Sequence, residues 1–334
     1  MLKALSNLSD KDMQFIPKRK TRILILVVIL VGSASYQFSN AAGQTNGFDL
    51  SNATLPSAEI MHGGPPRDGI PALSNPKLIK PGQADYLSDG DRIVGITING
   101  QSRAYPIGIL NWHEIVNDKI DNQSFAITYC PLCGTAVAFD ASINGQVTEF
   151  GVSGLLYNSD VLLYDRQTES LWSQIMQQSI AGKRVGQKLR AIPISHTSWR
   201  DWLNKHPNTL VMSDDTGFSR DYQRDPYSGY ETSRSTYFAV NNQAPDNYHP
   251  KELVMGIEVE GVYKAYPFVE MEQAGRPTFT DTVNGRELVF NWDSRNRAVT
   301  VFDTSGKQLA GIQGFWFAWF AFHPETSVFK ASDL

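Results

Sequence analysis

Apolar and polar residues alternate along most of the chain, in short segments that tight turns separate. Residues 93–110, IVGITINGQSRAYPIGIL, show the pattern clearly, because two alternating segments flank an Asn-Gly pair and a proline interrupts the second. Alternation with period two is typical of half-buried strands, and an Asn-Gly connection is typical of a β-hairpin. Helical periodicity is confined to short stretches such as residues 199–206. We therefore expect an α+β fold, mainly antiparallel β with few short helices.

The hairpin pattern occurs a second time. Residues 254–271, VMGIEVEGVYKAYPFVEM, align without a gap with residues 93–110 and share the Ala-Tyr-Pro of the second strand. Further along, WRDWLNKHP at 199–207 and WFAWFAFHP at 316–324 keep two tryptophans and a His-Pro pair at one spacing. This correspondence predicts two related repeats in tandem.

The repeats divide the chain into predicted segments. These are a signal peptide or signal anchor at 1–42, an extended N-terminal segment at 43–85, a first repeat with the cysteines at 86–213, a connecting excursion at 214–250 and a second, cysteine-free repeat at 251–330. The second repeat carries NWDSRN, residues 291–296, where the first carries YCPLCG, residues 129–134. This difference suggests one working half and one structural half.

The first 42 residues have the layout of an export signal. Six lysines and arginines within residues 1–22 precede the apolar run ILILVVILVG at 23–32, and small residues follow. This order is typical of a secretory signal peptide. We expect cleavage near Ala41 or Ala42, and the alternative is an uncleaved anchor that attaches the protein to the membrane through residues 23–32. Both predict an exported protein, in the periplasm or on the extracytoplasmic face of the inner membrane.

The rest of the chain is acidic. Outside the first 22 residues, 24 lysines and arginines face 32 acids, which gives a net charge of −8. Nucleic-acid binding needs a basic face that neutralises phosphates, so we expect no nucleic-acid partner.

The two cysteines of the sequence, Cys130 and Cys133, lie two residues apart at the end of a predicted strand. A Cys-x-x-Cys pair binds soft or borderline metals, and the expected ion is copper or zinc. Such a site needs a further ligand. His113 is the candidate, with Glu114 as a neighbouring carboxylate. Both belong to residues 109–118, ILNWHEIVND, which predict a short helix.

Two other interpretations of the cysteine pair stay open. In one, the protein is a thiol-dependent enzyme or oxidoreductase, in which a cysteine reacts and His113 acts as the base. In the other, the protein is a non-catalytic envelope scaffold whose cysteines form a structural disulfide, which an oxidising compartment permits. The sequence leaves open whether the protein is an enzyme. Candidate catalytic residues are Cys130, Cys133, His113 and Glu114.

Polar residues between apolar stretches in the first repeat are typical of a turn flanked by core residues, and the alternative is a pocket. In LLYNSDVLLYDRQTESLWSQ, residues 155–174, aromatic residues are interspersed with polar ones, as in many ligand pockets. The predicted lining residues there are Tyr157, Asn158, Ser159, Asp160 and Trp172. Asp68, in the loop GGPPRDGIPAL at 63–73, is a further candidate.

Four stretches in a fixed order make the sequence recognisable. They are AYPIGILNWHEIVND at 104–118, ITYCPLCGTAVAFD at 127–140, GVSGLLYNSDVLLYDRQTESLWSQ at 151–174 and DTGFSRDYQRDPYSGY at 215–230. With them the chain resembles, from about residue 63 to about residue 328, the bacterial and archaeal family catalogued as domain of unknown function 3179. The resemblance implies neither an activity nor catalytic residues, because the family has none assigned.

Overall fold

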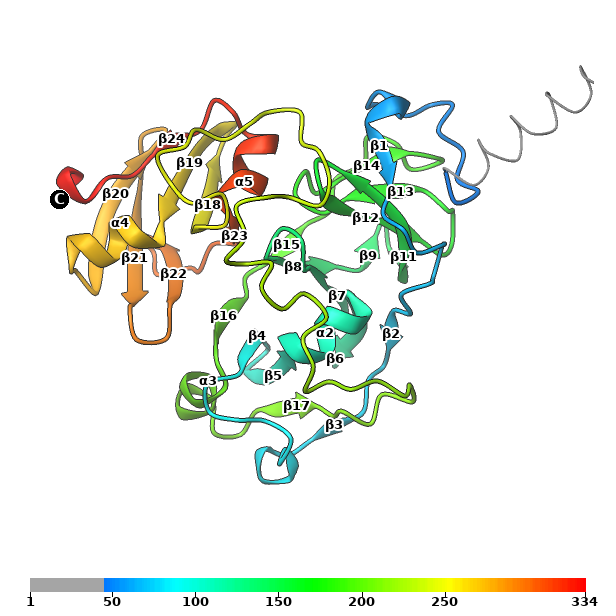
Figure 1. Cartoon of the computed structure of the whole chain (residues 1–334). Helices are drawn as coiled ribbons and strands as arrows, with labels where there is room; N and C mark the ends of the chain where they lie inside the picture. Colours follow the sequence, from blue (N-terminus) through cyan, green and yellow to red (C-terminus); the bar gives the residue numbers. More distant parts are fainter. Residues whose placement is uncertain (1–44) are drawn as a thin grey trace, which may run out of the picture.

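Strands provide most of the regular structure in the computed structural model, which describes residues 45–334 (Figure 1). Four α-helices of seven residues each occur in this part of the chain: α2 (Ile107–His113), α3 (Trp199–Lys205), α4 (Phe268–Ala274) and α5 (Trp316–Phe322). The predicted α+β fold, mainly antiparallel β with few short helices, is confirmed. The predicted signal segment at 1–42 lies outside the described residues. Within residues 45–334, no helix has the length and apolar character needed to cross a bilayer.

Two parts of the chain follow the same order of elements. The first comprises β4 (Arg92–Ile98), β5 (Gln101–Pro106), α2, β6 (Ile115–Ile120), β7 (Gln123–Cys130), β8 (Thr135–Asp140) and later β16 (Ser195–Ser198), α3 and β17 (Leu210–Met212). The second comprises β18 (Leu253–Val259), β19 (Val262–Pro267), α4, β20 (Thr278–Val283), β21 (Arg286–Asp293), β22 (Ala298–Asp303), β23 (Ile312–Phe315), α5 and β24 (Ser327–Val328). In both parts the strand before the last helix pairs antiparallel with the first strand, and the strand after it pairs parallel with the second.

A nine-stranded sheet joins the two parts. Its order is β2-β6-β7-β8-β23-β18-β19-β24, and β15 (Ala191–Ile192) also pairs with β8. The link between the parts is the pairing of β8 with β23, through Ala136 and Gln313. A five-stranded sheet, β16-β4-β5-β17-β3, and a three-stranded sheet, β20-β21-β22, complete the two parts; β2 is Leu73–Ser74 and β3 is Leu78–Ile79.

The first part contains an insertion between β8 and β16. It supplies four strands of a five-stranded sheet, β1-β11-β12-β13-β14, whose β1 precedes β4 in the chain, and it also holds a small hairpin of β9 (Ser142–Ile143) and β10 (Gln146–Val147). The strands of the larger sheet are β1 (Ile60–His62), β11 (Phe150–Tyr157), β12 (Asp160–Asp165), β13 (Leu171–Ser173) and β14 (Gln178–Ala181). Residues 214–250, all of them described, form neither helix nor strand and run over the face between the two parts (Figure 1).

Each part packs a tryptophan against a glycine of its first strand. A Cβ atom on Gly95 of β4 would lie 2.4 Å from the ring of Trp202, and one on Gly256 of β18 would lie 2.2 Å from the ring of Trp319. Both distances are far below van der Waals contact. The absent side chain therefore lets α3 and α5 approach the strands, and both tryptophans are buried.

We expect Gly95→Ala and Gly256→Ala to lower the free energy of unfolding by about 1–3 kcal/mol each, because an added methyl group overpacks a closed contact. Denaturant unfolding measures the loss. Gly82→Ala is the matched control, since a Cβ atom there meets nothing within 4 Å. Equal stability of Gly95→Ala and the control would contradict the close packing.

His323 follows α5 and is buried among aromatic rings. Its imidazole stacks on Tyr263 with ring centroids 4.0 Å apart and lies 4.3 Å from Trp319. Burial lowers the pKa of His323 from 6.5 to about 4, because the charged form would lose its hydration. The folded state therefore favours the neutral ring.

The stability that this neutral ring contributes is complete above pH 6.5 and is lost as the pH falls through about 4. We expect His323→Phe, which keeps an aromatic ring but cannot titrate, to lose less stability over this window. Between pH 6.5 and 4, the difference in the free energy of unfolding between the wild-type protein and the variant should grow by about 3 kcal/mol. This follows from about 1.4 kcal/mol for each unit of pKa shift. Urea unfolding at several pH values measures it, and parallel pH profiles would show that His323 does not titrate in this window.

Candidate metal centre

The turn between β7 and β8 carries both cysteines. Cys130 is the last residue of β7, and the backbone N–H of Cys133 donates to the carbonyl of Cys130 over 3.2 Å. Gly134 then adopts a positive φ of 60°, and a Cβ atom there would lie 2.9 Å from the Phe315 ring. The backbone N–H of Phe315 also donates to the carbonyl of Cys133 over 2.8 Å. The second part of the chain thus supports the turn.

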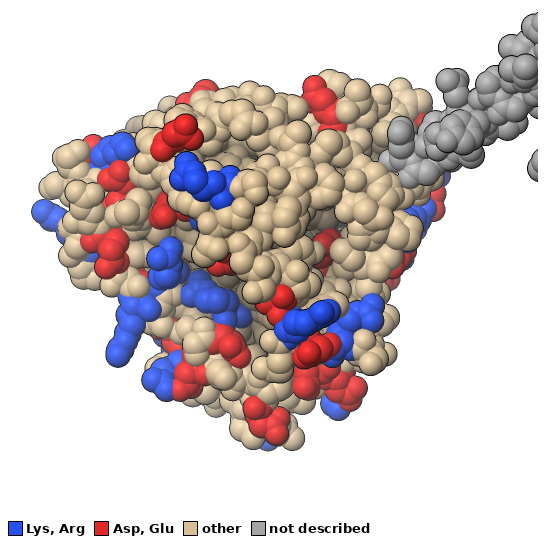
Figure 2. Space-filling model, viewed as in Figure 1, with Lys and Arg blue, Asp and Glu red and all other residues tan. Residues whose placement is uncertain are grey.

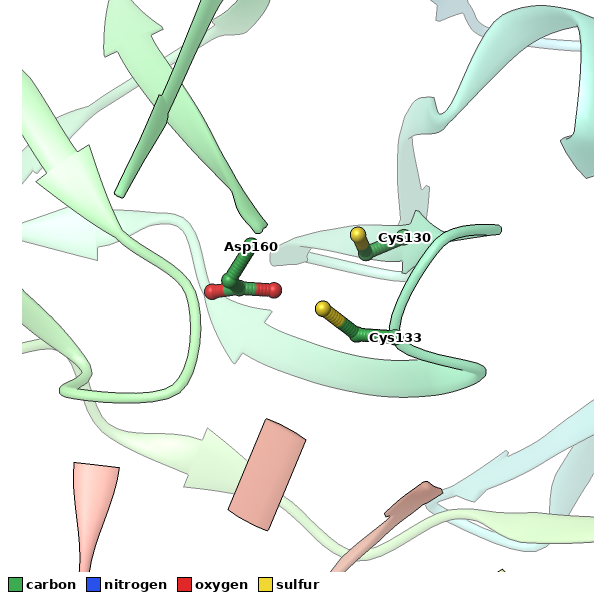
Figure 3. Close-up of side chains that lie close together, drawn as sticks. All are labelled: Cys130, Cys133 and Asp160. Carbon is green, nitrogen blue, oxygen red and sulfur yellow. The ribbon is translucent and has the colours of Figure 1, made fainter. Parts of the chain in front are cut away.

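The hairpin of β11 and β12 brings a third group to the cysteines. Its two turn residues, Asn158 and Ser159, both have positive φ, and Asp160 begins β12. The carbonyl of Ser159 accepts from the thiol of Cys133 at 3.3 Å and from that of Cys130 at 3.7 Å. Both sulfur atoms and a carboxylate oxygen of Asp160 lie within 4.8 Å of one another (Figure 3). We call Cys130, Cys133 and Asp160 the thiol–carboxyl cluster.

The cluster is dry, and one of its polar atoms lacks a hydrogen bond to the described residues. Cys133 and Asp160 are 0% exposed, and Cys130 is 1% exposed. One carboxylate oxygen of Asp160, Oδ2, accepts from the backbone N–H of Ile175 at 3.2 Å. The other, Oδ1, is buried and has no hydrogen-bond partner among the described residues. A buried oxygen in this state retains its desolvation penalty, which a ligand could relieve.

Burial shifts the titration of all three groups towards the neutral form. It raises the pKa of Asp160 to about 7 and also raises the pKa of the Cys130 thiol. The pKa of Cys133 is raised well above its usual value, first by burial and then by Cys130. A positive ion in the cluster would reverse these shifts, because it stabilises thiolate and carboxylate.

Glu114 lies close to the cluster. It follows α2 with a positive φ of 57°, and β6 begins at the next residue, so the helix expected over 109–118 ends at His113. Burial, and then the charge of Asp160, raise the pKa of Glu114 to about 8. The residue lines a largely apolar cavity of about 360 Å³ together with Leu132 and Phe238.

His113 does not belong to the cluster. One ring nitrogen, Nδ1, lies 2.7 Å from the carbonyl oxygen of Pro71, and the other, Nε2, lies 2.7 Å from the hydroxyl of Tyr222. Burial is the main reason why its pKa is lowered. The sequence predicts His113 as the third ligand, but the structure brings Asp160 to the cysteines instead.

The other predicted pocket residues have separate surroundings. Asp68 pairs with Arg166, and the indole N–H of Trp172 donates to Asp165 over 2.9 Å. Tyr157, at the end of β11, is only partly buried. Asp160 is therefore the one predicted pocket side chain in the cluster, and its approach to the cysteines carries no signal in the sequence beyond its Asn-Ser-Asp turn.

Residues 214–250 cover the cluster. The hydroxyl of Ser159 donates to the carbonyl of Phe238 over 3.2 Å. The backbone N–H of Asn241 donates to the side-chain oxygen of Asn158 over 2.8 Å. This segment therefore forms hydrogen bonds with both turn residues of the β11–β12 hairpin.

The cysteines are free, so the disulfide expected for the scaffold interpretation is not formed. We expect both thiols of metal-free protein to react with a disulfide reagent at pH 8 at least about tenfold more slowly than in denaturant, because they are buried and protonated. Thiol titration before and after unfolding measures this, and two thiols per unfolded chain are the internal control. Fast reaction of one thiol in the folded protein would favour the thiol-enzyme interpretation.

Comparison with known proteins gives one match. Residues 67–311 match the model of the family described as protein of unknown function, DUF3179. No curated protein and no solved structure matches the chain. The match covers most of the chain and includes the whole thiol–carboxyl cluster. The chain therefore belongs to the DUF3179 family.

Proposed function

We propose that this protein is an exported metal-binding protein that holds a zinc ion through Cys130, Cys133 and Asp160. The observation that carries the proposal is the buried, unpartnered Oδ1 of Asp160 beside two buried thiols. These three groups offer two sulfur ligands and one oxygen ligand at the spacing that a single ion can draw together.

The ligand chemistry favours zinc over copper. Copper(I) selects soft sulfur ligands, whereas zinc accepts cysteine, histidine and carboxylate together. Because the third group is the carboxylate of Asp160, the site suits zinc better than copper(I). Three protein ligands are also the number found in catalytic zinc sites, which keep the fourth position for water or substrate.

Glu114 is suited to act on a water or substrate molecule in that fourth position. It lies near enough to Asp160 for the two charges to interact, and it also lines the adjoining cavity. A carboxyl group within hydrogen-bond reach of a metal-activated water could exchange protons with it. We therefore propose Glu114 as the acid–base group of the site, where a metal would supply an activated water.

The thiol-enzyme alternative has less support. A reactive cysteine needs a lowered pKa and access to solvent, and both thiols have a raised pKa and are buried. His113, the base of that hypothesis, is not in the cluster.

The organisation of the chain is part of the same proposal. We propose that residues 86–213 and 251–330 are tandem repeats of one unit, of which the first carries the metal. Matching contacts support this: Tyr105 donates to Asp118 over 2.7 Å, and Tyr266 donates to Asp281 over 2.8 Å. Export, to the periplasm or the outer face of the inner membrane, rests on the signal-like residues 1–42.

We expect protein purified without chelator to contain about one zinc ion per chain. Cys133→Ser and Asp160→Asn should weaken zinc binding by more than about 100-fold, because even loss of a residue that only supports a ligand costs 10- to 100-fold. Elemental analysis and competition with a chromophoric chelator measure both.

His113→Gln is the matched control and should keep the metal. Circular dichroism of each metal-free variant tests whether it folds. Zinc that survives Asp160→Asn and is lost in His113→Gln would overturn the assignment of Asp160.

A further inference from the structure

A second cavity, of about 570 Å³, lies between the two parts of the chain. Its basic residues are Arg92, Arg200, Arg295 and Arg297. Figure 2 shows Lys and Arg side chains gathered around a hollow in the region where Figure 1 places β22 and β16. We call this space the arginine cavity.

Within the described part of the chain, three of the four arginines have no acidic partner. Arg200 pairs with Asp89, but in residues 45–334 no carboxylate forms an ion pair with Arg92, Arg295 or Arg297. The lining includes two further acids. Of these, Asp201 pairs with Lys205, which leaves Glu231 alone against three positive charges. The cavity therefore carries an excess of positive charge.

Backbone hydrogen bonds fix the position of the Arg92 side chain in the cavity. Its guanidinium donates to the carbonyl of His196 over 2.8 Å and also to the carbonyls of Asn296 and Arg297. Burial and the neighbouring charge of Arg297 lower the pKa of Arg92 to about 10. The positive charges of Arg92 and Arg297 repel each other in a partly dehydrated space, and a bound anion would offset this repulsion.

The cavity also offers a free acceptor and an apolar wall. The side-chain oxygen of Gln313 is buried without a hydrogen-bond partner among the described residues, while its amide nitrogen lies 3.0 Å from His196. Ile107, Leu253 and Phe315 supply apolar lining. The volume is in the range of cavities that hold small organic ligands.

Two of the four arginines come from the counterpart of the cysteine turn. Arg295 and Arg297 lie between β21 and β22, as the cysteines lie between β7 and β8. Both turns border the cavity, because Tyr129 and Gly134 of the first turn also line it. The sequence difference between the two turns therefore corresponds to two different chemistries.

We propose that the arginine cavity binds a small organic anion, whose carboxylate or phosphate group lies between Arg92, Arg295 and Arg297. Arginine matches the planar, two-oxygen edge of both groups. The organic part of the ligand lies on the apolar wall. The site is separate from the thiol–carboxyl cluster and does not depend on the proposed zinc.

Calorimetric titration of the full chain with phenyl phosphate and with benzoate tests the proposal, because the two probes share a ring and differ in the anionic group. We expect at least one to bind with a Kd of about 1 mM or tighter, and binding to weaken as salt rises. Phenyl phosphate alone would identify a phosphate site, benzoate alone a carboxylate site, and both a site that recognises the shared anionic character.

The double variant Arg295→Gln, Arg297→Gln should weaken binding by about tenfold or more, and both side chains are exposed, so the fold should persist. The control Arg276→Gln, Lys307→Gln removes two exposed positive charges outside the cavity and should leave the Kd unchanged. Binding of neither probe, or an equal loss in the control, would overturn the proposal. Binding by chelator-treated protein separates this outcome from failure of the zinc proposal.

Discussion

The exclusion of water from two thiols and one carboxyl group is the constraint around which this structure is organised. The β7–β8 turn supplies the sulfurs, the β11–β12 hairpin supplies Asp160, and residues 214–250 close the space above them. The insertion that contains β11 and β12 has no counterpart in the described second part, so the chain has a separate sheet that positions the carboxylate.

The two corresponding turns show how one arrangement of strands supports unlike chemistry. In the first part the turn between the second and third strands after the helix presents sulfur to a buried space. In the second part the same turn presents guanidinium groups to an open cavity. Phe315 of the second part holds the cysteine turn through its backbone, so the second part also contributes to the cluster as a support.

Local patterns in the sequence predict the fold class and two of the three residues of the cluster. Strand alternation, Asn-Gly turns and short helical stretches each span a few residues, and so the antiparallel character follows from them. Cys130 and Cys133 are close for the same reason. Asp160 lies in another sheet, and its approach to the cysteines depends on long-range strand pairing, which periodicity does not encode. His113 is near in sequence, but α2 ends there, and its ring contacts Pro71 and Tyr222.

The cover formed by residues 214–250 has a consequence for kinetics. Because this segment has neither helix nor strand, few of its own backbone hydrogen bonds hold it, and it can open without disruption of a sheet. An ion in the cluster, whose three residues are at most 1% exposed, would leave when such an opening uncovers it. Its residence time would then be set by the rate at which the cover lifts, and tight retention would not require an exceptional intrinsic affinity.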